Sequence, residues 1–232
     1  MKKMSKVAAI LAALVLVAGL TACQKKAFSG GLMFSNGLIM KGAAVTDYTP
    51  DVPAKLSVPK GTAKIGENAF ANCLVLASVT IPDTVMTLSH DAFNGCKNLK
   101  SAKIGNGVEV IGYSSFEDCK SLASVTMGDG VKAIGSEAFK GCENLKSVKI
   151  PSSVETINSS AFAGCENLAS VTMPGSMKEI KGEAFKGCDK LEVTYEGTKT
   201  QWDGIKKDSF NGIGSFVVHC TDGDVTVKDK KD

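Results

Sequence analysis

The sequence predicts an α/β-type repeat solenoid that is mostly β, built from six units of 23 residues with a cap at each end. Phenylalanine recurs at this interval, at Phe70, Phe93, Phe116, Phe139, Phe162 and Phe185. Cysteine keeps the same step, at Cys73, Cys96, Cys119, Cys142, Cys165 and Cys188. A period held over six units without insertion or deletion is typical of a solenoid, in which each unit packs on its neighbours.

Composition supports one folded unit and argues against nucleic acid as a partner. The chain has 232 residues, of which 44% are hydrophobic, which is enough for a sizeable core. The net charge of +3 comes from Lys2, Lys3 and Lys6, because the other 24 lysines balance 24 acidic residues. The chain contains no arginine, the residue whose planar fork best recognises phosphates and base edges.

The N-terminus has the layout of a secretory signal peptide. A basic start is followed by an apolar run at residues 7–20, which is too short for a comfortable transmembrane helix. Residues 20–23, Leu-Thr-Ala-Cys, resemble the lipobox of bacterial lipoproteins. That resemblance implies cleavage after residue 22, lipid attachment at Cys23 and an anchor in the bacterial membrane, with the outer membrane or cell surface as the expected location. The alternative is an ordinary cleaved signal with a cysteine nearby by chance.

Residues 23–50 are expected to form the lipidated N-terminus, a tether and an N-terminal cap. Glycine, lysine and serine near the start suit a flexible tether. A short apolar piece at residues 37–40 is expected to add a strand that covers the open first coil, since the stacking face of an end coil would otherwise be wet.

Within each unit the apolar positions indicate one short strand and two corners. Val148 and Ile150 flank Lys149, an alternation that predicts a strand with one buried face. Proline or glycine follows at the equivalent site of every unit and ends the strand. A further inward pair, such as Val154 and Ile157, precedes a second corner, and the Phe and Cys positions close the coil on the far side.

The pattern L-x-x-V-x-I-P-x-x-V-x-x-I-x-x-x-A-F-x-x-C resembles the 23-residue leucine-rich repeat of treponemal and BspA-type bacterial surface proteins, over residues 51–191. The resemblance implies a right-handed leucine-rich-repeat coil with a parallel sheet on its concave face. Residues 192–232 resemble the closing segment of the same proteins and are expected to form a C-terminal cap. This segment contains Trp202, a strand at residues 215–220 and a hairpin turn at residues 221–224.

The repeated cysteines have the wrong spacing for a metal site. Zinc ligands cluster within a few residues, whereas these cysteines lie 23 apart with no histidine nearby. Buried thiols that pack as small hydrophobic groups are the favoured interpretation. Disulfides between stacked coils stay open, because neighbouring coils lie within bonding reach and secretion favours oxidation. Cys220 lies outside the series and either is free or pairs with an end cysteine.

The sequence predicts no catalytic site, no cofactor and no metal. His90 occupies a variable position expected to be exposed, and His219 is a strand neighbour of Cys220, so their side chains point to opposite faces. Residues 222–224 contain two carboxylates but lack the spacing of a calcium loop. Neither a phosphate-binding loop nor a nucleophile elbow occurs.

The outward positions of the predicted strands are therefore the candidate binding residues. They are Ser78, Thr80, Ser101, Lys103, Ser124, Thr126, Ser147, Lys149, Ser170 and Thr172. The same polar columns also suit a solvated face that keeps the protein soluble, since aromatic or arginine anchors are missing.

The family resemblance implies adhesion to host matrix or to other bacteria. The hypothesis is a monomeric, non-catalytic surface lipoprotein that binds a protein or glycan partner. The alternative is an envelope scaffold without a host ligand.

Overall fold

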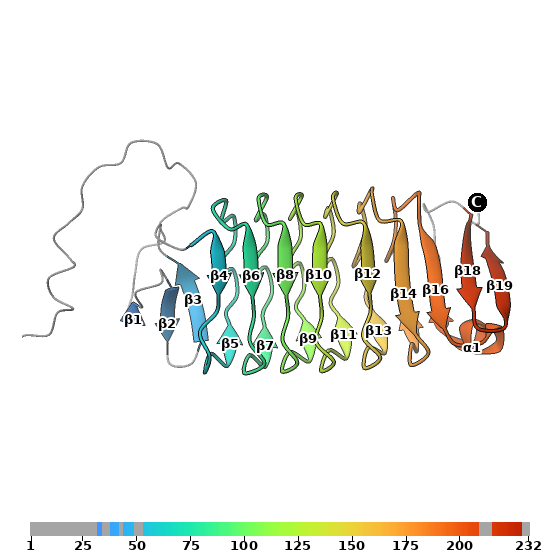
Figure 1. Cartoon of the computed structure of the whole chain (residues 1–232), viewed down its shortest axis with the longest axis horizontal. Coiled ribbons are helices and arrows are strands. Elements are labelled where there is room, and N and C mark those ends of the chain that lie inside the picture. The colour runs from blue at the N-terminus through green and yellow to red at the C-terminus, as the bar shows by residue number, and fades with distance from the viewer. Residues whose placement is uncertain (1–31, 34–37, 42–43, 49–52, 209–214, 229–232) are drawn as a thin grey trace, which may run out of the picture.

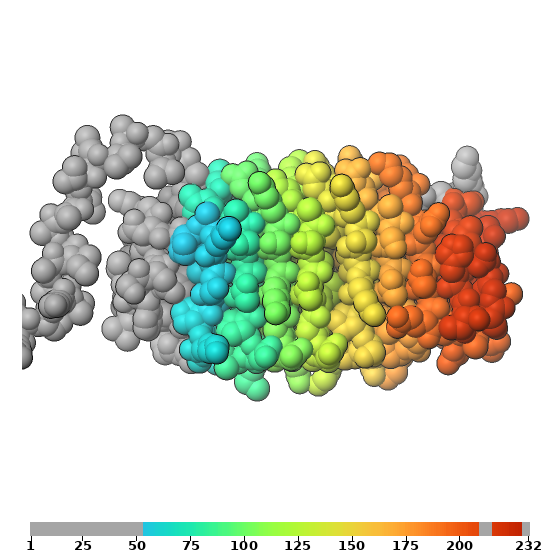
Figure 2. Space-filling model, viewed as in Figure 1, coloured from blue at the N-terminus to red at the C-terminus, as the bar shows by residue number. Residues whose placement is uncertain are grey.

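The structure, a computed structural model, describes residues 32–33, 38–41, 44–48, 53–208 and 215–228, with side chains from residue 53 onward. The chain winds into an elongated coil in which each turn contributes one strand to each of two parallel ladders (Figure 1). Figure 2 shows successive turns as bands along the long axis. The predicted mostly-β solenoid is confirmed.

The first ladder contains the strands that the sequence predicts and one further strand, β16 (Glu192–Glu196), that it does not. Its members are β4 (Lys55–Ser57), β6 (Ser78–Thr80), β8 (Ser101–Lys103), β10 (Ser124–Thr126), β12 (Ser147–Lys149), β14 (Ser170–Pro174), β16 (Glu192–Glu196) and β18 (Phe216–Cys220). In β12, Val148 is buried between the exposed Ser147 and Lys149, which is the expected alternation. Strand β19 (Gly223–Val227) pairs antiparallel with β18 through the predicted hairpin.

A second ladder of two-residue strands was not predicted. Its members along the repeats are β5 (Lys64–Ile65), β7 (Thr87–Leu88), β9 (Val110–Ile111), β11 (Ala133–Ile134), β13 (Thr156–Ile157), β15 (Glu179–Ile180) and β17 (Lys206–Lys207). The second corner that the sequence predicts in each unit lies where these strands end, at Ile-Gly pairs such as Ile134 and Gly135. Two residues are too few to show an alternating pattern, so the sequence carries no strand signal here.

The N-terminal residues that the structure describes extend the second ladder. Strands β1 (Leu32–Met33), β2 (Leu38–Lys41) and β3 (Ala44–Tyr48) pair antiparallel, and β3 pairs parallel with β5. The prediction of a strand at the apolar piece near residue 38 is confirmed by β2.

The core contains a continuous stack of phenylalanine rings. The ring centroids of successive coils lie 4.9–5.4 Å apart, and neighbouring planes differ by at most 10°. All six rings are fully buried. This spacing is typical of favourable offset aromatic contacts and slightly exceeds the strand spacing of about 4.8 Å. The phenylalanine series is therefore core, as predicted.

The cysteine series packs beside the rings and joins neighbouring coils. From Cys96 to Cys188, each thiol donates to the backbone carbonyl of the phenylalanine 26 residues earlier, with Sγ–O distances of 3.0–3.2 Å. None of these five forms a disulfide, so the interpretation as buried thiols is confirmed for them. Burial raises the pKa of Cys96, Cys142 and Cys165 well above 9 and that of Cys188 to about 12.

The first ladder is interrupted between β10 and β12, while the second ladder is continuous there. In the preceding coil Ile104 N donates to Thr126 O at 2.8 Å. The equivalent bond from Met127 to the next coil is missing from the described backbone, as is the one from Lys146 back to the previous coil. Figure 1 shows these two strands further apart than their neighbours.

A change of corner residue accompanies the interruption. A Cβ added to Gly128 would lie 2.6 Å from the backbone of the preceding corner, so glycine allows the corners at residues 105 and 128 to nest closely. Pro151 follows at the same site, so the corner changes from glycine to proline where the ladder is interrupted. The first ladder resumes with the pairing of β12 and β14.

The ladders continue past residue 191, because β16 pairs in parallel with β14. A short helix follows, α1 (Lys199–Gly204), with Thr198 and Gln201 forming a capping box. Trp202 and Tyr195 are buried in edge contact, with centroids 5.4 Å apart. Lys207 donates to the Trp202 carbonyl, and its Nζ lies 4.9 Å from the centroid of the indole ring. The predicted strand at residues 215–220 is β18.

Candidate binding surface

The ten sequence-predicted side chains lie on the outer face of the first ladder. Each is partly or fully exposed, and the residues between them are buried. Strand pairing brings Ser78, Ser101 and Ser124 side by side, and likewise Thr80, Lys103 and Thr126. The four residues of β12 and β14 form a second group in the same manner. The interruption between β10 and β12 separates the two groups, so the face is not one continuous lattice.

The two lysines of this face differ in their surroundings. Lys149 Nζ lies 3.8 Å from Glu196 Oε1, and both side chains are exposed. Lys103 makes no ion pair with any residue that the structure describes. An exposed pair at this distance is worth at most about 1 kcal/mol. Both ammonium groups are therefore accessible to an external partner.

The outer face of the second ladder is the surface that sequence reasoning missed. Toward the C-terminus it carries alternating lysine and glutamate from successive coils. Lys132 pairs with Glu109 at 2.8 Å, Lys178 with Glu155 at 2.8 Å, and Lys206 with Glu179 at 2.5 Å. These contacts between neighbouring coils cover the face with compensated charge.

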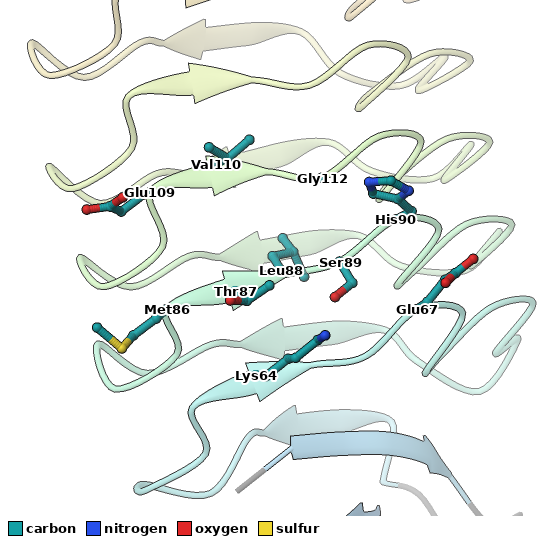
Figure 3. A pocket seen from close by; sticks show the side chains of 10 residues that line it. All are labelled: Lys64, Glu67, Met86, Thr87, Leu88, Ser89, His90, Glu109, Val110 and Gly112. Carbon is teal, nitrogen blue, oxygen red and sulfur yellow. The ribbon is translucent and has the colours of Figure 1, made fainter.

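Toward the N-terminus the same face is hollowed and apolar. A hollow of about 500 Å³ is lined by Lys64, Glu67, Met86, Thr87, Leu88, Ser89, His90, Glu109, Val110 and Gly112. Figure 3 shows Met86 and Glu109 on one side, His90 and Glu67 on the other, and Lys64, Thr87 and Val110 between them. The hollow therefore crosses three successive coils.

Three large hydrophobic side chains are exposed at this hollow. Met86 is 69% exposed, Val110 is 48% exposed and Tyr113 is 43% exposed. Within the chain described from residue 53 onward, no other large hydrophobic side chain is classed as exposed. The Tyr113 ring packs edgewise on His90 at a centroid distance of 5.9 Å. His90 is exposed, as the sequence predicted.

A comparison of the repeats would have revealed this patch. The position before each second-ladder strand carries Glu109, Lys132, Glu155 and Lys178 in later units but Met86 in an earlier one. The first residue of the strand is Thr87 or Thr156 in some units but Val110 in another. Apolar residues thus replace polar ones at outward positions, a signal that requires knowing which positions face outward.

The remaining candidates are structural or lie outside the described residues. Cys23 falls outside them. Asp222 accepts from the Lys199 backbone at 2.8 Å, and Asp224 lies 2.9 Å from His219 Nδ1, so both carboxylates hold the C-terminal turn. Cys220 is half-buried, and its pKa is raised by desolvation and by Asp222.

The described segments contain neither a metal-binding cluster nor a membrane-spanning helix. They contain no cluster of three or more histidine, cysteine or acidic side chains suited to a metal ion. None of their helices combines the length and apolar character that crossing a bilayer requires.

Solved structures of bacterial proteins share this architecture. A leucine rich cell surface protein from Faecalibacterium prausnitzii is 26% identical, with a TM-score of 0.57 over 72% of this chain and 55% of that protein. This chain thus spans about half the length of that relative. The T. pallidum leucine rich repeat protein is also 26% identical, with a TM-score of 0.56 over 72% of this chain and 82% of its own.

A leucine-rich repeat protein from Eubacterium ventriosum is 22% identical, with a TM-score of 0.63 over 84% of this chain and 54% of its own, and supports the fold. No curated protein matches the sequence. The model of the BspA type leucine rich repeat region matches six copies over residues 55–213. The resemblance inferred from the repeat pattern is confirmed, and the chain belongs to the BspA-type leucine-rich repeat family.

Proposed function

We propose that this chain is a non-catalytic, lipid-anchored surface protein whose repeats bind another macromolecule on host matrix or on other bacteria. The observation that carries the proposal is the pair of exposed, in-register outer faces that the two ladders present along one axis. Solenoids commonly bind partners through such extended surfaces. The similar protein from Faecalibacterium prausnitzii is a cell surface protein, which supports the same location.

The proposed domain plan follows the sequence. Residues 1–22 are a signal peptide, residues 23–50 a lipidated tether and cap, residues 51–191 the repeats, and residues 192–232 the C-terminal cap. The burial of Trp202 and Tyr195 after the last full repeat supports a cap there, because aromatic side chains cover the end of the core.

Binding is tested with the purified chain immobilised and exposed to an array of extracellular-matrix proteins and glycans. Saturable binding supports the function. The variant Lys103→Glu with Lys149→Glu should weaken a partner held by the first ladder and leave the melting temperature nearly unchanged, because both side chains are exposed. Lys60→Glu with Lys97→Glu, two exposed lysines outside the strands, is the matched control and should leave binding unchanged.

Surface location is tested by treating intact cells with protease. Release of the repeats supports the adhesin. Full protection, together with no binding on the array, would favour an envelope scaffold instead.

A further inference from the structure

We propose that the hollow on the second ladder docks an extended polypeptide segment of a partner protein. The segment places an aliphatic side chain against Met86 and Val110 and a basic side chain toward Glu67. The inference rests on the proposed function and deepens it, since it names the surface and the chemical class of the partner. It also places the principal contact with the partner on the second ladder rather than on the polar face of the first ladder.

The exposure of Met86, Val110 and Tyr113 is the first argument. They come from two neighbouring coils: Met86 and Val110 line the hollow, and Tyr113 packs against His90, which also lines it. Contiguous exposed apolar groups on a soluble domain mark interaction sites, and methionine and tyrosine are enriched in protein interfaces. The flexible thioether of Met86 adapts to aliphatic side chains of different shape. The rest of this face carries paired lysine and glutamate, so the apolar character is local.

The shape of the hollow suits an extended chain. Parallel pairing of Ile65, Leu88 and Ile111 sets the residues that follow them side by side in three coils. Two of these residues, Ser89 and Gly112, line the hollow, and both are small.

Longer side chains border the hollow on both sides. Met86 and Glu109 lie on one side, and His90 and Glu67 on the other. Coils repeat about every 4.8 Å, so the trough runs along the axis over about three coils. Its volume of about 500 Å³ falls within the range of built binding sites.

The unpaired charges around the hollow tell which side chains of an occupant would be complemented there. Glu109 already pairs with Lys132. Glu67 is exposed and makes no ion pair within the described part of the chain, and the same holds for Lys64. Since Glu109 is compensated, the unpaired charges of the lining are one carboxylate, on Glu67, and one ammonium group, on Lys64. A lysine or arginine of the partner complements Glu67, and a carboxylate or backbone carbonyl complements Lys64.

The lining favours peptide over glycan. Sugar rings stack on open aromatic faces, and their hydroxyl groups exchange hydrogen bonds with planar amides. The lining contains no tryptophan, phenylalanine, asparagine or glutamine. The nearby Tyr113 ring is already packed edgewise on His90. Methionine and valine side chains instead match aliphatic groups, while the hydroxyls of Thr87 and Ser89 suit a peptide backbone.

The test uses a phage-displayed library of random linear peptides, panned on the immobilised full chain. Peptides that combine aliphatic and basic residues should be enriched. A synthetic copy of an enriched peptide should lose affinity by about tenfold or more for Met86→Ser with Val110→Thr. Glu67→Gln should weaken binding and reduce its salt dependence. The control pair Asp129→Asn with Ser152→Ala, two exposed residues outside the strands and outside the hollow, should bind as the wild type does.

Three outcomes would overturn the inference. They are the absence of enriched peptides, unchanged affinity of the Met86/Val110 variant, and displacement of the peptide by a glycan rather than by a second peptide. Concentration-dependent self-association that the same variant abolishes would also overturn it, by assigning the hollow to a second copy. If the wild-type chain still binds a macromolecule on the array in these cases, the proposed function stands and only this docking site fails. If it binds nothing there either, both fail.

Discussion

The thiol of Cys142 donates a hydrogen bond to the backbone carbonyl of Phe116 in the preceding coil, with Sγ and O 3.2 Å apart. The same contact recurs in successive coils, so each thiol satisfies a buried carbonyl of its neighbour. A thiol is a weak donor but is small and tolerates burial. The constant 23-residue spacing of the cysteines thus reflects a hydrogen bond between neighbouring coils rather than a catalytic or metal-binding site.

The buried thiols should resist alkylation in the folded chain. Only the thiolate reacts, and burial raises the pKa of Cys96, Cys142 and Cys165 well above 9. We expect no labelling of Cys96 to Cys188 by iodoacetamide near neutral pH and complete labelling after denaturation without a reductant. Peptide mass spectrometry gives the readout. Cysteine peptides that stay joined by a disulfide after denaturation would contradict the structure.

Alkaline pH should destabilise the fold through the same cysteines. The pKa of Cys188 is about 12 when folded, against an ordinary value of 9. Between these values the unfolded chain loses the thiol proton while the folded chain keeps it, so stability falls as pH rises from 9 towards 12. Each such cysteine contributes about 1.4 kcal/mol per pH unit. Urea denaturation across this window should show a shallower fall for Cys188→Ala than for the wild type, and parallel curves would refute the mechanism.

Ser115→Ala should stabilise the chain. Ser115 is fully buried, and its hydroxyl has no hydrogen-bond partner within the described part of the structure. The equivalent residue in the other five units is alanine. Removing the unsatisfied hydroxyl should raise the free energy of unfolding by about 1–2 kcal/mol, measured by urea denaturation. The exposed Ser124→Ala serves as a control near zero, and a loss of stability at Ser115 would show that its hydroxyl is bonded.

Amide exchange should locate the interruption of the first ladder. The Met127 and Lys146 amides lack the bonds between coils that Ile104 and Lys100 make. A hydrogen bond contributes about 0.5–1.5 kcal/mol, so their exchange should be faster by up to about tenfold. Hydrogen exchange followed by NMR gives the comparison residue by residue. Equal protection at the four amides would mean that β10 and β12 pair in solution.

Cys23→Ala should release the protein from membranes. The lipobox-like residues before Cys23 predict acylation there, and acyl chains hold a protein on a bilayer by about 0.8 kcal/mol for each buried CH₂. Fractionation of cells should recover the wild type with the membranes and the variant in the soluble fraction. Cys220→Ala is the matched control and should stay with the membranes. Unchanged partitioning of Cys23→Ala would exclude the lipid anchor.

Trp202→Ala should destabilise the C-terminal end. Trp202 is 2% exposed and contacts Tyr195. Loss of a buried tryptophan costs about 3–5 kcal/mol, here concentrated in the last coil. Asp203→Ala, an exposed residue of the same helix, is the control. Equal melting temperatures for both variants would argue against a capping role.

Much of the architecture could be predicted because the strongest signals are periodic. The phenylalanine and cysteine series fixed the coil length, and the alternation around Val148 revealed the first ladder and its outward side chains. The second ladder escaped because each of its strands has two residues, and their pairing depends on neighbouring coils rather than on local pattern. Without that ladder, Met86 and Val110 could not be placed on an outer face, and the hollow between them had no sequence signal.

The interruption at β10 was missed for a related reason. Gly128 and Pro151 each predict the end of a strand, and the sequence gives both the same role. Their difference emerges only where one corner meets the next, since a Cβ at Gly128 would lie too close to the preceding corner. Contacts between units depend on pairs of residues 23 positions apart. Rules for turns consider only neighbouring residues within one unit, so they do not predict such contacts.

The thiol-to-carbonyl contact also bears on how such a molecule can change in length. Each coil takes one hydrogen bond from the coil after it and gives one to the coil before it, so a middle coil sees the same surroundings whatever the total number. A gain or loss of one 23-residue module between Cys142 and Cys188 would therefore preserve the thiol-to-carbonyl contact at each junction, and with it the hollow near the N-terminus. Duplication of gene segments could lengthen the molecule without redesigning the surface that we propose to dock a partner.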